Sequence, residues 1–531
     1  MKRLIFLLSV SAIKLFPQAS LNVTLAAQMT YPGLQCANIC GYVDSTGKEY
    51  ALVGLETGMS VVDVSNPSSP VIKYQVPWPV NNGNSLWKEI KVYKKYAYVV
   101  SEAGNGLQIC DLSKLPSSVA PVPVYWQPVI GGQTLSSVHA LHIDTTLGNV
   151  YLFGSNISNK GAVIGSLANP IAPVYLGKFD ATYIHDGYVD NDTLYACEIY
   201  DGNVEIIDCG NKTTPQVLAT VQTPLRFTHN SWLSPDKKTM FTTDEKTKSS
   251  LTSYDISNLA NITLLDTVKA LTTGSIVHNT HIRSDYFAVT SWYKDGFNIV
   301  DVSRPNNMIV TGYYDTYAAG SGNGFSGDWG VYPFLPSGTI VVTNIDEGLF
   351  VLSPTYVRAC YLEGNIKDSV TSLNLQNVTS QIIGNTASIT STNVSGDYAT
   401  GAAVAGTYTV QFSKSGYQTK VVTGVGITNG MVTTLNRKLA PLGMGVAPVY
   451  NEKTFLVGKN VFEDKTTMKY YLSNADAGNA VLRVYDYSGN LVIEQRLNDM
   501  IGEITLGEGL AKGIYLVTLN SSKPIKIIKA N

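Results

Sequence analysis

The chain has 531 residues, of which 15% are charged, and its formal net charge is −2. A chain of this length exceeds one compact core, which predicts two to four domains. The near-neutral charge means that the chain lacks the strong excess of positive charge that is typical of proteins that bind nucleic acid or anionic membranes. We therefore expect partners to be recognised by shape, aromatic contact and neutral hydrogen bonds.

The N-terminal segment has the features of a secretory signal peptide. A basic start, Met1-Lys-Arg3, precedes an apolar run from Leu4 to Ile13, and a small residue follows at Ala19. We assign residues 1–19 to this signal. No other segment reaches 18 apolar residues, so we expect no transmembrane segment in the mature chain. Export permits disulfides, but the six cysteines match no zinc spacing, and we expect free or singly paired core cysteines.

One pattern then occurs seven times between residues 37 and 352. In each copy a strand-like run ends in a short turn, and a second run carrying an acidic or small residue follows. Tyr50-Ala-Leu-Val-Gly with Ser60-Val-Val-Asp63-Val-Ser is one copy, and Tyr286-Phe-Ala-Val with Gly296-Phe-Asn-Ile-Val-Asp301-Val-Ser is another. A step of roughly 45 residues is typical of propeller blades or solenoid turns.

Four short strands are predicted within each repeat. In the copy that contains Asp301 they cover residues 278–282, 286–291, 296–302 and 308–313, an antiparallel meander with turn residues between the strands. An isolated four-stranded sheet cannot bury both of its faces. Seven such sheets should therefore stack and close into a ring, which predicts a seven-bladed β-propeller over residues 20–355.

The last repeat lacks a fourth strand. Its predicted strands cover residues 330–334, 339–343 and 348–352, after which the composition changes. The segment Leu21–Ala27 is strand-like and precedes the first complete repeat. We expect this segment to supply the missing outer strand, because a closed ring removes the exposed sheet edge.

Several phrases of these repeats resemble the LVIVD-repeat proteins of the choice-of-anchor B family. They are Trp87-Lys-Glu-Ile-Lys-Val92, the His-Asn and His-Asp pairs, and Gly327-Asp-Trp-Gly-Val-Tyr-Pro-Phe334. The resemblance covers about residues 20–355 and implies a β-propeller at the cell surface without an established activity. Cys40 stands where that family tends to carry a Trp.

Residues 360–440 are rich in Thr, Ser, Val and Gly. The segments Gly364-Asn-Ile-Lys-Asp368 and Ala405-Gly-Thr-Tyr-Thr-Val410 resemble a carboxypeptidase-regulatory-like domain. The resemblance implies a small β-sandwich of prealbumin type. We expect this sandwich to act as a spacer.

A linker is predicted over residues 441–452, before a third domain over residues 453–531. The segments Val481-Leu-Arg-Val-Tyr-Asp486 and Gly513-Ile-Tyr-Leu-Val-Thr-Leu519 resemble the C-terminal sorting domain of the type 9 secretion system, although Gly458-Lys-Asn-Val-Phe462 replaces its usual Pro-Asn-Pro opening. The resemblance implies a β-sandwich that engages the type 9 secretion machinery. It also implies removal of this tail, and release of the protein or its attachment to the outer-membrane surface.

All six histidines fall just before or within the first predicted strand of a repeat. In a propeller this strand lines the central channel, so residues at matching positions should converge. Glu89 or Lys88 takes the corresponding place in the second repeat, and Asp328 or Trp329 takes it in the seventh. The candidates for lining the channel are Glu89, His139, His185, Asp186, His229, Asn230, His278, Asn279 and Asp328.

Two interpretations of these channel residues stay open. Imidazoles and carboxylates around one axis could hold a divalent metal, with His185, His229 and His278 as the candidate ligands. Alternatively, the same side chains hydrogen-bond the neighbouring blade and form a structural network. The carboxylates Glu102, Glu198 and Asp244-Glu245 lie near the ends of second strands. We expect these to be exposed loop carboxylates.

The sequence favours a secreted or cell-surface binding or adhesion protein of all-β fold, with an extracellular glycan or protein as its ligand. No nucleophile motif is present and no catalytic residue is assigned. The alternative is an extracellular propeller enzyme, a hydrolase or lyase that uses channel histidines and Glu89 as acid and base. Fold class does not separate these two functions.

Overall fold

The computed structural model is all-β and describes residues 19–79, 85–442, 453–457, 459–472, 480–499, 501–519 and 524–530. The predicted signal peptide, apart from Ala19, and most of the predicted linker lie outside the described residues. The described part of the chain divides into two compact units: the described residues within 19–366, 374–412 and 421–437 belong to the first, and those within 367–373, 413–420 and 438–530 belong to the second. Among the described residues, no helix has the length and apolarity needed to span a membrane.

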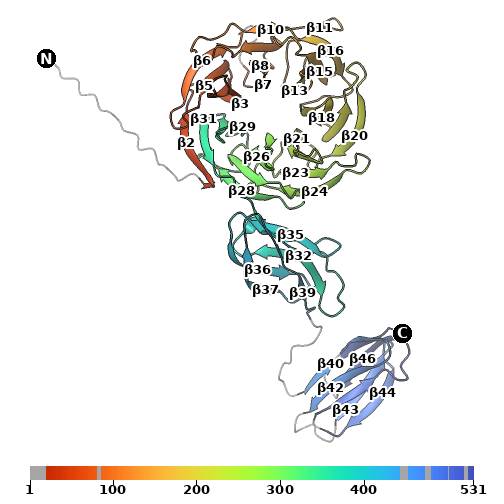
Figure 1. Cartoon of the computed structure of the whole chain (residues 1–531). Coiled ribbons are helices and arrows are strands. Elements are labelled where there is room, and N and C mark those ends of the chain that lie inside the picture. Colours follow the sequence, from red (N-terminus) through yellow and green to blue (C-terminus); the bar gives the residue numbers. More distant parts are fainter. Residues whose placement is uncertain are drawn as a thin grey trace, which may run out of the picture. The chain divides into compact units, whose positions relative to one another are not determined.

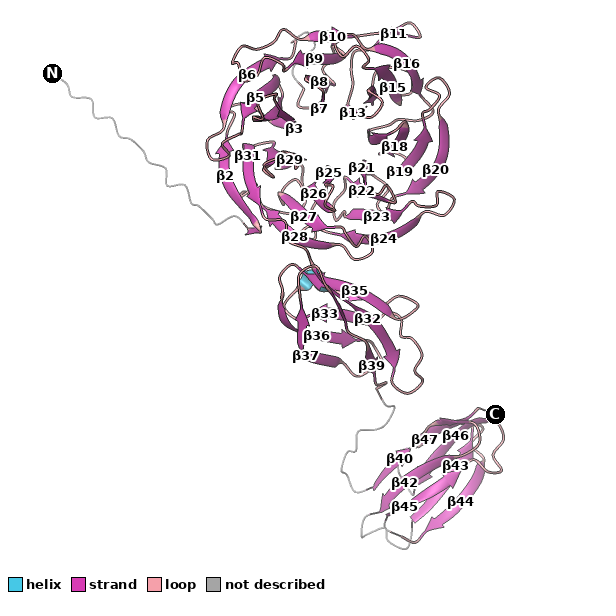
Figure 2. Cartoon of the chain, viewed as in Figure 1, coloured by secondary structure: helices cyan, strands magenta, loops and turns pink. Residues whose placement is uncertain are grey.

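In the first unit, seven antiparallel sheets of four strands, one of them extended by a fifth strand, follow one another around a ring (Figure 1). In most sheets the chain runs from an inner strand to a strand on the rim (Figure 2). The first three sheets consist of β3 (Cys36–Val43), β4 (Glu49–Leu55), β5 (Gly58–Asp63) and β6 (Val71–Pro77); β7 (Lys88–Tyr93), β8 (Tyr96–Ser101), β9 (Leu107–Asp111) and β10 (Val124–Trp126); and β13 (Ala140–Asp144), β14 (Asn149–Phe153), β15 (Ala162–Ser166) and β16 (Val174–Phe179).

The remaining sheets continue the same order. The fourth and fifth sheets consist of β17 (Asp186–Asp190), β18 (Thr193–Glu198), β19 (Asn203–Asp208) and β20 (Gln216–Gln222); and β21 (Thr228–Leu233), β22 (Thr239–Asp244), β23 (Leu251–Asp255) and β24 (Thr263–Val268). The sixth and seventh consist of β25 (Thr280–Ile282), β26 (Phe287–Ser291), β27 (Phe297–Asp301), β28 (Ile309–Tyr314) and β1 (Ser20–Leu21); and β29 (Asp328–Tyr332), β30 (Ile340–Asn344), β31 (Gly348–Pro354) and β2 (Val23–Met29). A hairpin of β11 (Val129–Ile130) and β12 (Gln133–Thr134) follows the second sheet.

The Asp that recurs at the end of the third strand closes a turn. The carboxylate of Asp63 accepts a hydrogen bond from the backbone N–H of Ser65 at 3.1 Å, and Asp301 accepts one from Ser303 at the same distance. A side chain that bonds the backbone two residues later stabilises a turn and stops a strand. This explains why Val-Asp-Val-Ser ends the third strand in two repeats and why Asp111 and Asp255 hold the same place before a Ser in two others.

The N-terminal strand completes the last sheet, as predicted. β2 pairs antiparallel with β31, from Val23 opposite Pro354 to Met29 opposite Leu349. β2 is the outer strand in the order β2-β31-β30-β29, and it lies so close to Gly348 that a methyl group there would collide with the carbonyl oxygen of Met29. The strand begins two residues later than expected, since Leu21 belongs to β1 and pairs with β28.

Neighbouring sheets are held together by apolar side chains that interleave between them. Between the sixth and seventh sheets, Phe287 and Phe297 pack in one buried cluster with Phe350 and with Val23 of β2. Burying one such side chain contributes about 1.5–3 kcal/mol to the free energy of unfolding. All six cysteines are free and buried, as expected for core cysteines.

Downstream of the ring the described residues again form only strands and one short 3-10 helix. These elements are β32 (Cys360–Asp368), β33 (Thr379–Ile382), η2 (Thr386–Ser388), β34 (Thr390–Ser391), β35 (Asp397–Ala402), β36 (Gly406–Ser413), β37 (Lys420–Ile427), β38 (Val432–Thr434) and β39 (Arg437–Leu439). One small sheet contains the order β35-β32-β38 and the other has the order β34-β33-β36-β37.

The C-terminal part of the second unit has its own core, in which Phe462, Leu482 and Val517 are buried together. Its two sheets have the orders β40-β42-β45 and β41-β47-β46-β43-β44. Their strands are β40 (Lys453–Val457), β41 (Val461–Phe462), β42 (Thr466–Leu472), β43 (Ala480–Asp486), β44 (Leu491–Leu497), β45 (Ile501–Leu506), β46 (Gly513–Leu519) and β47 (Ile525–Lys529).

Candidate functional site

The centre of the ring contains three cavities that follow one another along a channel. We call the end at which the first strands begin the histidine end, and the end at which they turn into the second strands the hairpin end. The cavity at the histidine end has a volume of about 20 Å³, and the middle cavity has about 10 Å³. The cavity at the hairpin end, here called the vestibule, has about 450 Å³.

Four imidazoles from consecutive sheets form the histidine cluster, which consists of His139, His185, His229 and His278. Their ring centroids are separated by 4.1 Å between His139 and His185, and by 4.8 Å between His185 and His229. A further 4.1 Å separates His229 from His278. The structure therefore brings together the four histidines that the repeat alignment predicts to converge.

β-Bulges explain how some of these side chains reach the channel. In β21 the pairing with β22 passes from Thr228 to Asn230, so His229 is an extra residue on the inner strand. Trp329 of β29 is an extra residue in the same way. A bulge re-aims a side chain without ending the strand. As a result His229 and Trp329 both line the cavity at the histidine end.

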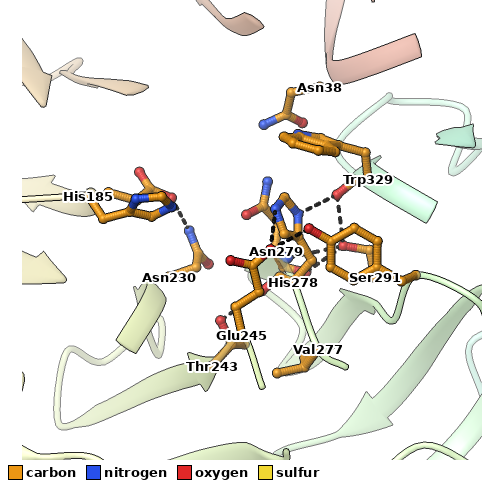
Figure 3. A network of polar contacts seen from close by, with 12 residues as sticks. Asn38, His185, Asn230, Thr243, Glu245, Val277, His278, Asn279, Ser291 and Trp329 are labelled. Carbon is orange, nitrogen blue, oxygen red and sulfur yellow. Dashed lines mark hydrogen bonds and ion pairs between the residues drawn. The ribbon is translucent and has the colours of Figure 1, made fainter. Parts of the chain in front are cut away.

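Hydrogen bonds orient the rings of the histidine cluster. His139 lies with Nδ1 2.7 Å from a carboxylate oxygen of Glu102 and with Nε2 3.1 Å from Nε2 of His185. His278 donates from Nδ1 to the carbonyl oxygen of Trp329 at 2.7 Å (Figure 3). Because that nitrogen carries the proton, Nε2 of neutral His278 presents its lone pair, and it lies 3.9 Å from Glu245.

Burial keeps three of these imidazoles, those of His185, His229 and His278, neutral. It lowers the pKa of His185 and of His229 well below the ordinary value, and the neighbouring imidazoles lower both further. Burial likewise lowers the pKa of His278 to about 3. Burial raises the pKa of Glu245 to about 7. These three imidazoles therefore present nitrogen lone pairs rather than positive charges.

The middle of the channel is filled by paired polar side chains. The carboxylate of Glu89 accepts hydrogen bonds from Asn38 and from Lys91. Asp186 accepts one from Asn230 at 2.7 Å, also drawn in Figure 3. Both oxygens of Glu89 are thus engaged, which favours a structural role for this residue over one as a general base. This paired layer separates the histidine end from the vestibule.

Two further candidates can be placed. Asn279 lines the cavity at the histidine end. Asp328 is fully buried but lies apart, because its carboxylate accepts a hydrogen bond from the hydroxyl of Thr316. Its neighbour Trp329 faces the channel instead, with its ring tilted by 35° and its centroid 4.7 Å from that of Trp87. Of the two alternatives for the seventh repeat, the structure therefore selects Trp329.

The vestibule is lined by aromatic residues that the sequence analysis missed. Trp232 lies at its centre, with ring centroids 4.7 Å from Tyr188, 4.8 Å from His281 and 5.9 Å from Phe334. Strand alternation could have found these residues, since Tyr188 and Trp232 follow the candidates Asp186 and Asn230 by two positions and share their face. Further lining residues include Cys40, Lys91, His142 and Tyr332.

The expectation that the carboxylates after the second strands are exposed is wrong for most of them. The Glu102 side chain is 39% exposed, but that of Glu245 is 15% exposed, and Glu198 and Asp244 are 2% and 3% exposed. Asp244 turns inward to accept hydrogen bonds from the backbone N–H groups of Leu225 and Phe227. These contacts depend on how the following loops fold, which strand periodicity does not report.

The variant Glu198→Gln should change how stability depends on pH. Burial, and then the nearby Glu205 carboxylate, raise the pKa of Glu198 to about 8. The folded state therefore favours the protonated form, and the stability that this form contributes is lost as pH rises from the unfolded-state pKa through about 8. Because Gln does not ionise, thermal unfolding at pH 9 should give a midpoint about 2–4 °C above wild type. At pH 5 the difference should vanish.

The exposed Glu347→Gln variant serves as the control for this measurement. It should shift the midpoint equally at both pH values. A Glu198→Gln difference that is the same at pH 5 and pH 9 would contradict the assignment of a protonated buried carboxyl.

Comparison with known proteins supports the repeat assignment. No curated protein matches the chain. The family model of the LVIVD repeat matches residues 47–77, 87–122 and 283–316. These segments include the second to fourth strands of the first sheet, the first three strands of the second sheet and the last three repeat strands of the sixth. The chain thus contains three LVIVD repeats, which together with its four-stranded antiparallel sheets are consistent with a repeat protein of β-propeller type.

Proposed function

We propose that residues 20–355 form a seven-bladed β-propeller that binds a small extracellular ligand in the vestibule, as part of a secreted or cell-surface binding protein. The LVIVD matches and the ring of four-stranded sheets support the fold. The observation that carries the function is the vestibule itself. Its volume of about 450 Å³ falls within the range of small-ligand sites, and it is lined by partly exposed aromatic side chains.

The ligand class follows from the chemistry of the lining. Trp232 and Tyr188 offer flat apolar surfaces, while His142 and His281 add polar atoms beside them. The backbone N–H of Val189 donates to Nδ1 of His142 at 3.2 Å, so neutral His142 carries its proton on Nε2 and can donate it to a ligand. Nδ1 of His281 has no hydrogen-bond partner within the described part of the chain.

A sugar ring combines the two properties that this lining requires. Its apolar face can stack on an aromatic side chain, and its hydroxyl groups can accept and donate hydrogen bonds at its edge. Asp190 also lines the vestibule, and its carboxylate, which is paired with Lys237, keeps further lone pairs that can accept a hydrogen bond from a sugar hydroxyl. We therefore infer that the ligand is a glycan, bound through one or two sugar units.

We propose further that the chain is exported by the type 9 secretion machinery. The basic and apolar N-terminal segment supports export across the inner membrane, and the segment from Gly513 to Leu519 supports recognition as a sorting tail. The strands between residues 360 and 440 are compatible with a spacer of β-sandwich type. The mature protein would then lie outside the outer membrane.

Deletion of residues 453–531 tests the export proposal. In a bacterium that has a type 9 secretion system, the full chain should reach the cell surface or the medium, whereas the shortened chain should accumulate in the periplasm. Cell fractionation with an antibody to the propeller measures the distribution. Surface display of the shortened chain would contradict the proposed role of the tail.

Titration of the full chain with a panel of mono- and disaccharides tests the vestibule. We expect at least one sugar to bind, and Trp232→Ala to weaken that binding at least about tenfold, which corresponds to about 1.4 kcal/mol, because the stacking surface is lost. Trp87→Ala is the matched control, since Trp87 lies at the histidine end and is 39% exposed. Its affinity should stay within about twofold of wild type.

Thermal unfolding of both variants separates lost binding from lost folding. Absence of binding by any sugar up to millimolar concentration would contradict the proposal. Binding by a folded Trp232→Ala protein with wild-type affinity would contradict it as well.

A further inference from the structure

The histidine end holds a group of side chains suited to a metal ion, which lies apart from the vestibule. His185, His229 and Glu245 come from two neighbouring sheets, and one ligand atom of each lies within 4.8 Å of the others. His229 is 5% exposed, and the Glu245 side chain is 15% exposed. Two imidazoles and one carboxylate in this arrangement are a donor set used for transition metals in proteins.

We propose that His185, His229 and Glu245 bind one divalent transition-metal ion, for which Zn²⁺ serves as the probe. Donor atoms around a tetrahedral zinc ion are about 3.4 Å apart, given bonds of about 2.1 Å. Small side-chain rotations would close the present separation to that value. Two of the three donors are imidazole nitrogens, so the set does not suit Ca²⁺ or Mg²⁺, which prefer oxygen ligands.

The surroundings of these three residues resemble the outer shell of a metal site. The hydroxyl of Tyr183 lies 3.2 Å from Nδ1 of His185, and the hydroxyl of Tyr293 donates to the carboxylate of Glu245. Partners of this kind fix the orientation of metal ligands. Nδ1 of His229 is buried and has no hydrogen-bond partner among the described residues.

The two remaining imidazoles of the histidine cluster flank the proposed site. Nε2 of His139 lies 3.1 Å from Nε2 of His185, and Nε2 of His278 lies 3.9 Å from Glu245. Either ring can supply a fourth ligand after a small rotation, or the fourth position stays with water. His278 was expected to be a ligand from the sequence. It stands second to Glu245 because it is not in the group whose ligand atoms all lie within 4.8 Å of one another.

The proposal differs from a purely structural network in what it predicts for Glu245. A structural network needs a hydrogen-bonding side chain at this position, which Gln supplies. A metal site needs a negative oxygen donor, which Gln does not supply. Glu245→Gln therefore separates the two, and Glu198→Gln is the matched control because Glu198 is also a buried carboxyl at the end of a second strand.

The experiment uses the purified full chain, stripped with a chelator and dialysed. Titration with ZnCl₂, followed by elemental analysis, should give about one bound Zn²⁺ per chain. Loading with Co²⁺ should give the visible absorption of a low-symmetry site with nitrogen and oxygen ligands. Glu245→Gln and His229→Asn should each weaken Zn²⁺ binding more than about 100-fold, since changes to outer-shell partners alone cost about 10–100-fold. Glu198→Gln should bind as wild type.

Several outcomes would overturn the proposal. One is a stripped wild-type protein that takes up no stoichiometric Zn²⁺ and gives no Co²⁺ spectrum, and this result does not depend on any variant folding. Another is a folded Glu245→Gln protein with wild-type affinity. Equal losses in Glu245→Gln and Glu198→Gln would also overturn it, because they would show that binding depends on general stability rather than on this carboxylate.

Discussion

Pairing of β2 with β31 is the interaction on which the rest of the structure depends. Without β2, the seventh sheet would end in an open edge, and edges of this kind invite pairing with other chains. Bringing together strands about 330 residues apart costs about 5 kcal/mol in chain entropy. Backbone pairing along β2 and burial of Val23 against Phe350 offset this cost. Closure also fixes the first strands around one axis, and so creates the channel.

The two ends of the channel have different chemistry although one set of strands builds both. At the histidine end, bulged or entering residues such as His229 point inward and their imidazoles are kept neutral by burial. Three residues after His229, Trp232 lines the vestibule with its aromatic ring. Between them, the carboxylates of Glu89 and Asp186 fill the channel and accept hydrogen bonds, Glu89 from Asn38 and Lys91 and Asp186 from Asn230. The same ring can thus carry a metal-type donor set at one end and a ligand pocket at the other without direct contact between them.

Much of this arrangement could be predicted from the sequence, because strand periodicity and turn residues are local signals. The four strands of the repeat that contains Asp301 begin and end within about two residues of their predicted bounds, and the role of the N-terminal strand followed from counting strands. Convergence of the histidines followed from the repeat alignment.

The features that could not be predicted depend on tertiary structure. Asp328 and Trp329 exchange places because a bulge adds one residue, and Glu245 is enclosed by a loop whose path no periodicity describes. The aromatic lining of the vestibule was not predicted, although side chains alternate between the faces of a strand and Trp232 therefore shares the face of Asn230.

Amide hydrogen exchange of the full chain, followed by mass spectrometry, tests ring closure most directly. If β2 completes the seventh sheet, the amides of Val23–Met29 that bond β31 should exchange as slowly as those of β30 and β31, because all of them would open only when the ring unfolds. Rapid exchange along β2 while β30 and β31 stay protected would contradict the account, because it would show that the ring holds its channel without the N-terminal strand.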